Sequence, residues 1–469
     1  MSNRSLFVVG DDAQSIYAFR GSKIEIILHF EDEYPGSKEI VLNQNYRSTQ
    51  PILDLAEKVL SHNPDQKKKA LFTQNDDTLM VKYHLARNER DEAEYIIKQI
   101  HQQYVTQDDK PMKSSNVEFV PDENMFANVT LDDDSSPIDT AVGNMFDFYM
   151  KDFSLSSLSP SLSSYKSNSW QVPEYNWKTI TELNNCAVLY RTHSQSRSIE
   201  ETFLKHGIPY RLVSGTRFLD RKEVKDAVSI LKYLVNSEDN LSLNRFLPLV
   251  MDGVGPKTME KIIAYLQDFD YPLPPKHQEQ VVELLTKLHS VWENNTTLID
   301  MTKDVLVSSG YMRYLHDEYP EKNEREARLE NIGELYSLML PFDEDQSISL
   351  QDRLRDFLAQ ILLMSGLDKD DADETPKISL MSLHQSKGLE FETVFLIGVE
   401  DGLLPHGNSL MEPDGFAEEV RLAYVGVTRA KKYLHLISAD SRVQFGQIKA
   451  NPPSRIFRPF LESSCLRVR

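Results

Sequence analysis

The chain has 469 residues, of which 40% are hydrophobic and 26% are charged, which is ordinary usage for a globular protein. This length predicts two to four domains, and the composition excludes a wholly disordered chain. No apolar run approaches the roughly 20 residues that a membrane-spanning helix needs, so no membrane protein is expected. The formal net charge of −20, taken alone, argues against a nucleic-acid-binding protein, but net charge describes the far field and not one groove.

Cysteine is rare in the chain. Cys186 and Cys465 cannot build a disulfide scaffold, which fits a reducing compartment. The CxxC and HExxH spacings do not occur, which argues against a structural zinc site or a zinc protease. We therefore expect no metal ligands of these kinds.

Apolar periodicity predicts alternating strands and helices at the start of the chain. The expected strands are 6–9, 40–42 and 80–85, and the expected helices are 24–30, 51–60 and 91–104. The first strand ends at Gly10-Asp11-Asp12, the pattern of a buried parallel strand that reaches an active edge.

The segment 105–178 has a different composition, with no sustained period and many serine and acidic residues. It is predicted to be a disordered or loosely packed insertion, and its aromatic residues could dock protein partners. Such a segment suggests a eukaryotic regulatory region that is phosphorylated.

Regular patterns return after this insertion. A strand is expected at 186–191, a helical block over 221–363, and further strands at 378–383, 394–399 and 433–438. An α/β unit thus opens, a helical block interrupts it, and the α/β unit closes. This order predicts an α/β fold in which a large helical domain is inserted into a nucleotide-binding-type parallel sheet domain.

Four sequence clusters carry groups suited to phosphate or nucleic-acid chemistry. The first is GDDAQSIYAFRG at 10–21. Gln14 can donate and accept hydrogen bonds, so it could sense a nucleotide γ-phosphate or its attacking water. Tyr17 and Phe19 follow at once and could stack on bases. A turn followed by core aromatics is the other interpretation.

The second cluster is LNQNYRS at 42–48. Tyr46 could stack on a base and Arg47 could clamp a phosphate. A surface arginine beside a packed tyrosine is the alternative.

The third cluster is SLHQSKGLEF at 382–391, between two apolar strands. Lys387 and Gly388 offer a charge and a close backbone approach, and His384 and Glu390 could reach a ligand. The alternative is a polar loop between strands.

The fourth cluster is EEVRLAYVGVTRAKKYL at 418–434, an amphipathic helix with Arg429 near its end. An arginine here could neutralise charge on a phosphate during transfer. The alternative is a helix-end arginine paired with an acid.

In this order, the four clusters resemble motifs III, IV, V and VI of the UvrD/Rep/PcrA family of superfamily-one DNA helicases. The stretch 186–227 also resembles the family's region between motifs IV and V. The resemblance covers nearly all of the chain except about 105–178.

The resemblance implies a nucleotide site. Gln14 would couple the γ-phosphate to the DNA site, Tyr46 would stack on adenine, and Glu390 would contact the sugar region. Arg47 and Arg429 would contact the γ-phosphate. The family hydrolyses ATP with Mg²⁺ while it translocates 3′ to 5′ along one DNA strand.

The resemblance also implies a DNA site. Tyr17, Phe19 and His384 would touch single-stranded DNA, with Arg20 supporting them. Two residues depart from the family pattern: Ala13 stands where many members have Asp, and Phe19 where many have Trp. Because Phe still stacks, we expect weaker base contact and not a lost function.

A glycine-rich turn, DGVGPKTMEKI at 252–262, lies in the helical block. Its backbone N–H groups and Lys257 could contact a DNA phosphate, as in a helix-hairpin-helix element. The family's inserted domain has a similar turn, and a plain helix start is the alternative.

A phosphate loop ends in Gly-Lys-Ser/Thr, and none of the 18 glycines is followed by lysine. A magnesium-binding acidic strand end is also absent from its expected place. The strings Asp32-Glu33-Tyr34 and Asp317-Glu318-Tyr319 have suitable residues, but neither follows an apolar strand. We therefore predict that this chain alone hydrolyses no ATP, and that the phosphate and metal ligands belong to the first domain.

By resemblance, the chain is expected to be the C-terminal part of an ATP-dependent 3′–5′ DNA helicase of repair or recombination. For a DNA-repair protein a nuclear location is expected, with an organelle as the alternative. Its partners would be single-stranded or forked DNA and ATP. A catalytically dead DNA-binding or regulatory paralogue is the competing hypothesis. Residues 1–38 would be a remnant of the first RecA-like domain, 39–214 with 376–469 the second, and 215–375 the inserted helical domain.

Overall fold

The structure is a computed structural model that describes residues 7–17, 23–63, 66–67, 69–75, 81–105, 177, 180–213, 215–366 and 375–461. These residues belong to one of the two units into which the chain divides. The other unit comprises Ser114–Pro173 and Arg469 and lies outside the described residues. The predicted insertion at 105–178 therefore falls almost wholly outside them.

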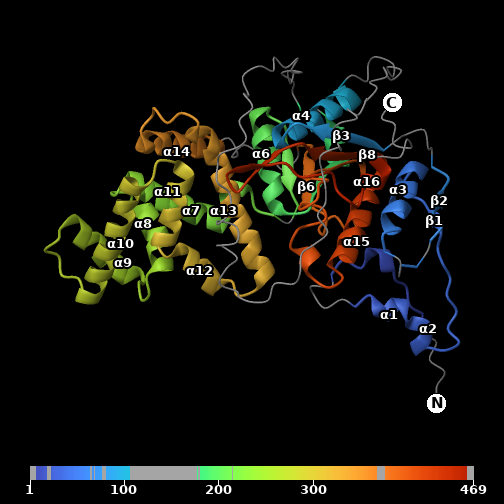
Figure 1. The fold of residues 1–469 in the computed structure, drawn as a ribbon, viewed down its shortest axis with the longest axis horizontal. Coiled ribbons are helices and arrows are strands. Elements are labelled where there is room, and N and C mark those ends of the chain that lie inside the picture. Colours follow the sequence, from blue (N-terminus) through green and yellow to red (C-terminus); the bar gives the residue numbers. More distant parts are fainter. Residues whose placement is uncertain are drawn as a thin grey trace, which may run out of the picture. The chain divides into compact units, whose positions relative to one another are not determined.

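The α/β part is built on a six-stranded sheet with the order β3-β8-β7-β4-β6-β5, in which every neighbouring pair is parallel (Figure 1). Its strands are β3 Lys82–Ala86, β4 Cys186–Tyr190, β5 Tyr210–Leu212, β6 Ile378–Ser382, β7 Phe391–Leu396 and β8 Ala430–Ala439. Every residue of β4 and β6 is buried, as expected where parallel strands are covered on both faces. The predicted α/β class with a parallel sheet is confirmed.

Helices cover both faces of this sheet. The helices of this part are α1 Glu25–Leu28, α2 Phe30–Glu33, α3 Gln50–Leu60, α4 Glu89–Ile100, α6 Ser196–Lys205, α15 Gly415–Val427 and α16 Arg458–Leu461. Helices α3 and α15 pack together and share a core with Leu434 and Leu436 of β8. Helices α4 and α6 pack together, and Tyr95 of α4 contacts His435 of β8. Because successive strand residues point to opposite faces, the two helix pairs lie on different sides.

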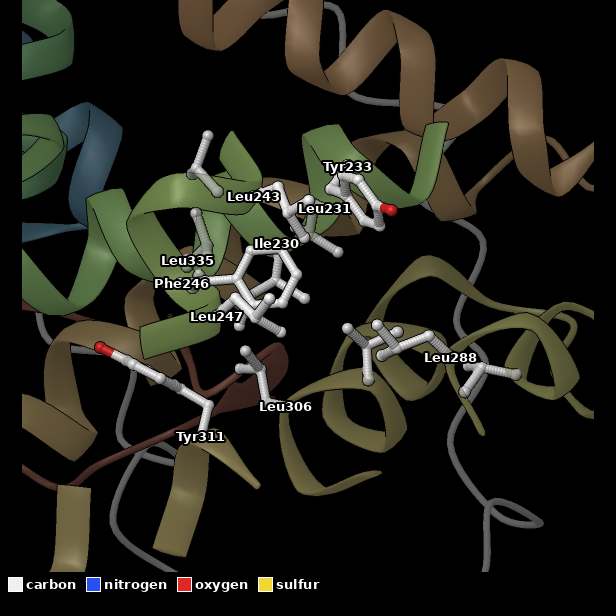
Figure 2. Packing of buried hydrophobic residues seen from close by; sticks show 14 of the residues in the cluster. Ile230, Leu231, Tyr233, Leu243, Phe246, Leu247, Leu288, Leu306, Tyr311 and Leu335 are labelled. Atoms are coloured by element: carbon white, nitrogen blue, oxygen red, sulfur yellow. The ribbon is translucent and has the colours of Figure 1, made fainter. Parts of the chain in front are cut away.

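A block of helices separates β5 from β6 in the chain. It comprises α7 Lys222–Val235, α8 Asn240–Val250, α9 Pro256–Gln267, α10 Pro275–Asn294, α11 Leu298–Ser308, α12 Tyr311–Glu318, α13 Lys322–Asp343 and α14 Leu350–Gly366. This block has its own apolar core, and Figure 2 shows Phe246, Leu306 and Leu335 converging in it. Among the described helices, none is both long and apolar enough to span a bilayer.

Two predicted strands do not form. Residues 7–10 and 40–42 form no strand and have no partner strand in the described part of the chain, and Phe7 and Leu42 are 86% and 80% exposed. A buried strand needs neighbours on both edges to satisfy its backbone groups, and the six-stranded sheet does not supply them here. The short strand β1 Gln44–Asn45 pairs in parallel with β2 Phe72–Thr73 instead. Strands β9 Arg442–Gln444 and β10 Gln447–Lys449 form an antiparallel hairpin.

Candidate functional site

Arg47 lies just beyond β1 and is held by groups from the far end of the chain. Its Nε donates to Glu390 Oε2 at 2.7 Å, and its Nη1 donates to the carbonyl of Thr428 at 3.3 Å. The other carboxylate oxygen of Glu390 is 2.8 Å from Lys431 Nζ. The hydrogen bonds from Lys431 and Arg47 lower the pKa of Glu390 to about 2, so its carboxylate is charged at neutral pH.

Arg429 lies two residues beyond the end of α15 and is only 1% exposed. Its Nε and Nη1 donate to the carbonyls of Val425 and Leu389, and its Nη2 donates to Thr428 Oγ1. Burial, with the nearby charge of Arg47, lowers the pKa of Arg429 to about 10, so the guanidinium stays charged at neutral pH.

Tyr46 presents its ring to solvent beside these charges. It is 79% exposed, and its hydroxyl donates to Gln44 Oε1 at 2.9 Å. An exposed ring next to Arg47 is chemically suited to stacking on a nucleotide base.

The segment Asp11–Tyr17 packs against the sheet part, with Ala13 and Ile16 fully buried in the core that α3 and α15 share. Lys387 Nζ donates to the carbonyl of Gln14 at 2.8 Å. Arg421 Nε donates to the carbonyl of Ser15 at 2.8 Å. Side chains from two further clusters thus hold the backbone of the first.

Tyr17 and His384 lie together at the end of this segment. The Tyr17 hydroxyl donates to the carbonyl of His384 at 3.1 Å, and the two ring centroids are 6.4 Å apart. Lys387 Nζ lies 5.0 Å from the centre of the Tyr17 ring. The first and third clusters therefore form one surface with two rings and a cation.

The predicted site residues divide into three groups. The structure joins Gln14, Tyr17 and His384 in one set of contacts. It joins Arg47, Glu390 and Arg429 in another, and the exposed Tyr46 directly precedes Arg47 in the chain. Lys257 is exposed on α9, which belongs to the helical block and not to the elements that carry the first two sets. Phe19 and Arg20 lie outside the described residues.

Three basic residues of the site were not singled out from the sequence. Lys431 follows the Thr-Arg-Ala turn in a lysine pair, Arg421 lies in the fourth cluster, and Lys69 lies in a basic run. A signal existed only for the first two, which fall inside quoted clusters. Their partners are distant in sequence, so the local residue pattern cannot predict these contacts.

The side chains of this cluster fit part of a nucleotide. The guanidinium of Arg47, the exposed Tyr46 ring and the Glu390 carboxylate suit a phosphate, a base and a sugar hydroxyl, respectively. In the described part of the chain, no group of three or more His, Cys, Asp or Glu side chains could hold a metal ion. These residues therefore fit the rim of a nucleotide site and not its metal centre.

Comparison with known proteins places this architecture in one class. A family model described as the UvrD-like helicase C-terminal domain matches residues 40–118 and 168–441. The UvrD/REP helicase N-terminal domain model matches residues 1–35. The chain belongs to the UvrD-like helicases.

Individual relatives are bacterial. The chain is 33% identical to the ATP-dependent DNA helicase PcrA of Staphylococcus epidermidis, over 98% of this chain and 54% of that protein. It is also 33% identical to the PcrA of Bacillus subtilis, over 96% of this chain and 53% of that protein. The chain thus spans about half the length of these relatives.

The expected nuclear location is wrong. The two relatives named above and the PcrA of Staphylococcus aureus come from bacteria, which have no nucleus. The expectation rested on an implied role in DNA repair and on the eukaryotic character suggested by the serine-rich acidic segment, whose composition carries no information on compartment.

Proposed function

We propose that this chain supplies the second RecA-like lobe and the inserted helical domain of an ATP-dependent 3′–5′ DNA helicase. The proposed parts are 39–214 with 376–469 for the lobe and 215–375 for the insertion. Residues 1–38 would belong to the first lobe. The enzyme would act on single-stranded or forked DNA in repair, with ATP and Mg²⁺.

The observation that carries this proposal is the position of the arginine cluster on the sheet. Glu390 directly precedes β7 and Arg429 directly precedes β8, so both lie at the amino ends of parallel strands. Phosphate cradles in such sheets lie at the opposite, carboxyl ends. Charges at the amino ends therefore suit a lobe that contacts a triphosphate held by another lobe.

The exposed apolar segments 7–10 and 40–42 support the presence of that other lobe in the working enzyme. Phe7, Val9, Ile40 and Leu42 are exposed although their residue types favour buried strands. A first lobe with the phosphate loop and the magnesium carboxylate would cover them. It could precede these residues in the same polypeptide or come from another chain.

The DNA-facing part of the proposal rests on the Tyr17–His384 surface. Its test is fluorescence anisotropy of the purified chain with labelled oligo(dT) and with a forked duplex. We expect binding, and we expect Tyr17→Ala to weaken it roughly five- to a hundredfold, the usual cost of one lost base stack. Tyr17→Phe is the matched control, because it keeps the ring and removes only the bond to His384. No binding by the wild type, or equal binding by Tyr17→Ala, would overturn this part.

The nucleotide-facing part is tested by ATPase measurements on the same chain. We expect no turnover with oligo(dT), because the sequence has no Gly-Lys-Ser/Thr loop. Turnover that Arg429→Ala abolishes would refute this expectation.

The missing loop also favours a second candidate, a DNA-binding or regulatory paralogue without ATPase activity. The coding sequence upstream separates the two candidates. An in-frame phosphate loop supports the helicase, whereas a stop codon just before Met1 with a transcript starting there supports the paralogue.

A further inference from the structure

Lys69, in the loop between α3 and β2, bridges the two acidic residues at the start of the first cluster. Its Nζ lies 2.5 Å from Asp11 Oδ1 and 2.5 Å from Asp12 Oδ1. The Lys69 side chain is 17% exposed and that of Asp12 is 4% exposed. One ammonium group thus bridges two carboxylates, one of them buried, on a segment that lies more than 50 positions away in sequence.

Asp11 also bonds the side chain of Gln14. Its Oδ2 accepts a hydrogen bond from Gln14 Nε2 at 2.6 Å, and its Oδ1 accepts one from the main-chain N–H of Ala13 at 3.1 Å. The carboxylate of Asp11 is therefore fixed by Lys69 on one oxygen and orients the Gln14 amide with the other. Lys69, Asp11 and Gln14 form a relay.

Asp12 anchors the same segment to the same loop. Its Oδ2 accepts hydrogen bonds from the Gln66 side chain and from the main-chain N–H of Lys67. Burial alone would raise the pKa of Asp12, but the hydrogen bond and charge of Lys69 outweigh it and lower that pKa. Without Lys69, the buried Asp12 carboxylate would lose its counter-charge.

The neighbouring cations act differently. Lys387 and Arg421 bond the main-chain carbonyls of Gln14 and Ser15 and leave the Gln14 side chain free to rotate. Among the described residues, only Asp11 is seen to bond the Gln14 amide nitrogen. The orientation of that amide therefore depends on Lys69.

We propose that Lys69 is a positioning residue that, through Asp11 and Asp12, orients Gln14 and holds the segment Asp11–Tyr17 to the second lobe. The proposal rests on the proposed function for the roles of Gln14 and Tyr17. Lys69 would act through its contacts with the carboxylates of Asp11 and Asp12.

The test compares Lys69→Met and Lys69→Arg with a matched control, Lys67→Met. Lys67 lies in the same loop, and its Nζ pairs with Glu39 at 2.7 Å, so the control removes the same charge and leaves the relay intact. Hydrogen exchange across residues 10–17 measures how firmly the segment Asp11–Tyr17 is held in place. Oligo(dT) affinity, measured over a range of salt concentrations, reports the positioning of Tyr17.

For Lys69→Met we expect amides 13–15 to exchange at least about tenfold faster, because local opening becomes easier. We expect a roughly fivefold or greater loss of oligo(dT) affinity, at the lower end of one lost base stack. The salt slope of binding should not change, and Lys69→Arg should restore both readouts. Lys67→Met should match the wild type in both.

Three results separate the alternatives. Unchanged exchange at 13–15 in Lys69→Met overturns the relay. A salt slope reduced by about 1 shows a direct phosphate contact and overturns the positioning role. Failure of the wild type to bind oligo(dT) overturns the proposed function, while the exchange data still decide the relay. If Lys69→Met does not fold, Asp11→Asn breaks the relay at its middle and leaves the Lys69–Asp12 pair, with the same expected results.

Discussion

Arg47 and Glu390 form an ion pair of 2.7 Å between residues 343 positions apart in the chain. Lys431 holds the second oxygen of the same carboxylate at 2.8 Å. The two cations thus hold one oxygen of the Glu390 carboxylate each, and the bond from its Nε fixes the guanidinium of Arg47 beside Glu390.

This arrangement predicts the titration of Glu390. Because its pKa is lowered to about 2, the carboxylate should stay charged on acidification until about pH 2, well below the ordinary midpoint of 4.5. Lys431→Met removes the largest cause of the shift and should move the midpoint up toward 4.5. Carbon-13 NMR of the glutamate side-chain carboxyls measures both midpoints. Lys432→Met is the control, since Lys432 pairs with Glu392 instead. An unchanged midpoint in Lys431→Met contradicts the prediction.

The two arginines should differ in their effect on stability. Arg429 is buried and donates to two main-chain carbonyls and Thr428, so Arg429→Ala should lower the free energy of unfolding by about 3 kcal/mol. Arg47 is partly exposed, so Arg47→Ala should change it by no more than about 0.5 kcal/mol. Urea denaturation followed by circular dichroism measures both. Equal losses would show that Arg429 has no structural role beyond that of Arg47.

The sequence predicts the fold well where residue patterns are local. Helix α7, Lys222–Val235, lies in the block expected to be helical at 221–363, because its apolar face repeats at helical spacing and packs into the helical core. The strands β4, β6 and β8 were found for a similar reason, as continuous apolar runs mark strands buried on both faces.

The sequence fails where a structure depends on a partner. Residues 7–9 have the residue types of a buried strand, yet their burial depends on a neighbour that the described sheet lacks. The relay from Lys69 and the pair of Lys431 with Glu390 join distant segments, and no local spacing encodes them. Roles taken from the family resemblance stay predictions until they are measured.

Helix α13 and the β9–β10 hairpin interlock at a glycine. A Cβ on Gly333 would lie 1.9 Å from Cδ1 of Phe445, so the ring occupies the place of a side chain. Gly333→Ala should displace that ring and lower the free energy of unfolding by about 1 to 3 kcal/mol, the usual range for overpacking.

The second substitution Phe445→Ala removes the clash, so the double variant should be more stable than the sum of the two single losses predicts. Urea denaturation of the four proteins gives the coupling. Additive losses would show that the ring and the glycine are not in contact.

A buried triad joins α4, the end of β7 and the hairpin. Arg442 Nη2 lies 2.8 Å from both Glu92 Oε1 and Glu400 Oε1, and both glutamates are 0% exposed. One guanidinium thus faces two carboxylates, and Glu92 Oε2 has no hydrogen-bond partner within the part of the chain that the structure describes. Burial raises the pKa of Glu92 above its ordinary value, although Arg442 opposes the shift.

The triad predicts a pH-dependent stability. A carboxyl group whose pKa is raised in the folded state stabilises the fold fully below its ordinary pKa of 4.5, and that contribution is lost as the pH rises through the raised value. Arg442→Met leaves Glu92 without its counter-charge, so it should lower the free energy of unfolding by about 3 to 5 kcal/mol near pH 8. The loss should be smaller near pH 5, where Glu92 can take up a proton.

Adding Glu92→Gln to the Arg442→Met variant removes the titrating group. The double variant should therefore regain part of the stability at pH 8 and show a weaker dependence on pH than Arg442→Met alone. Urea denaturation at both pH values measures these differences. If Arg442→Met loses the same free energy at pH 5 as at pH 8, the carboxyl of Glu92 does not control the stability of the triad, because a neutral buried group would cost the same at either pH.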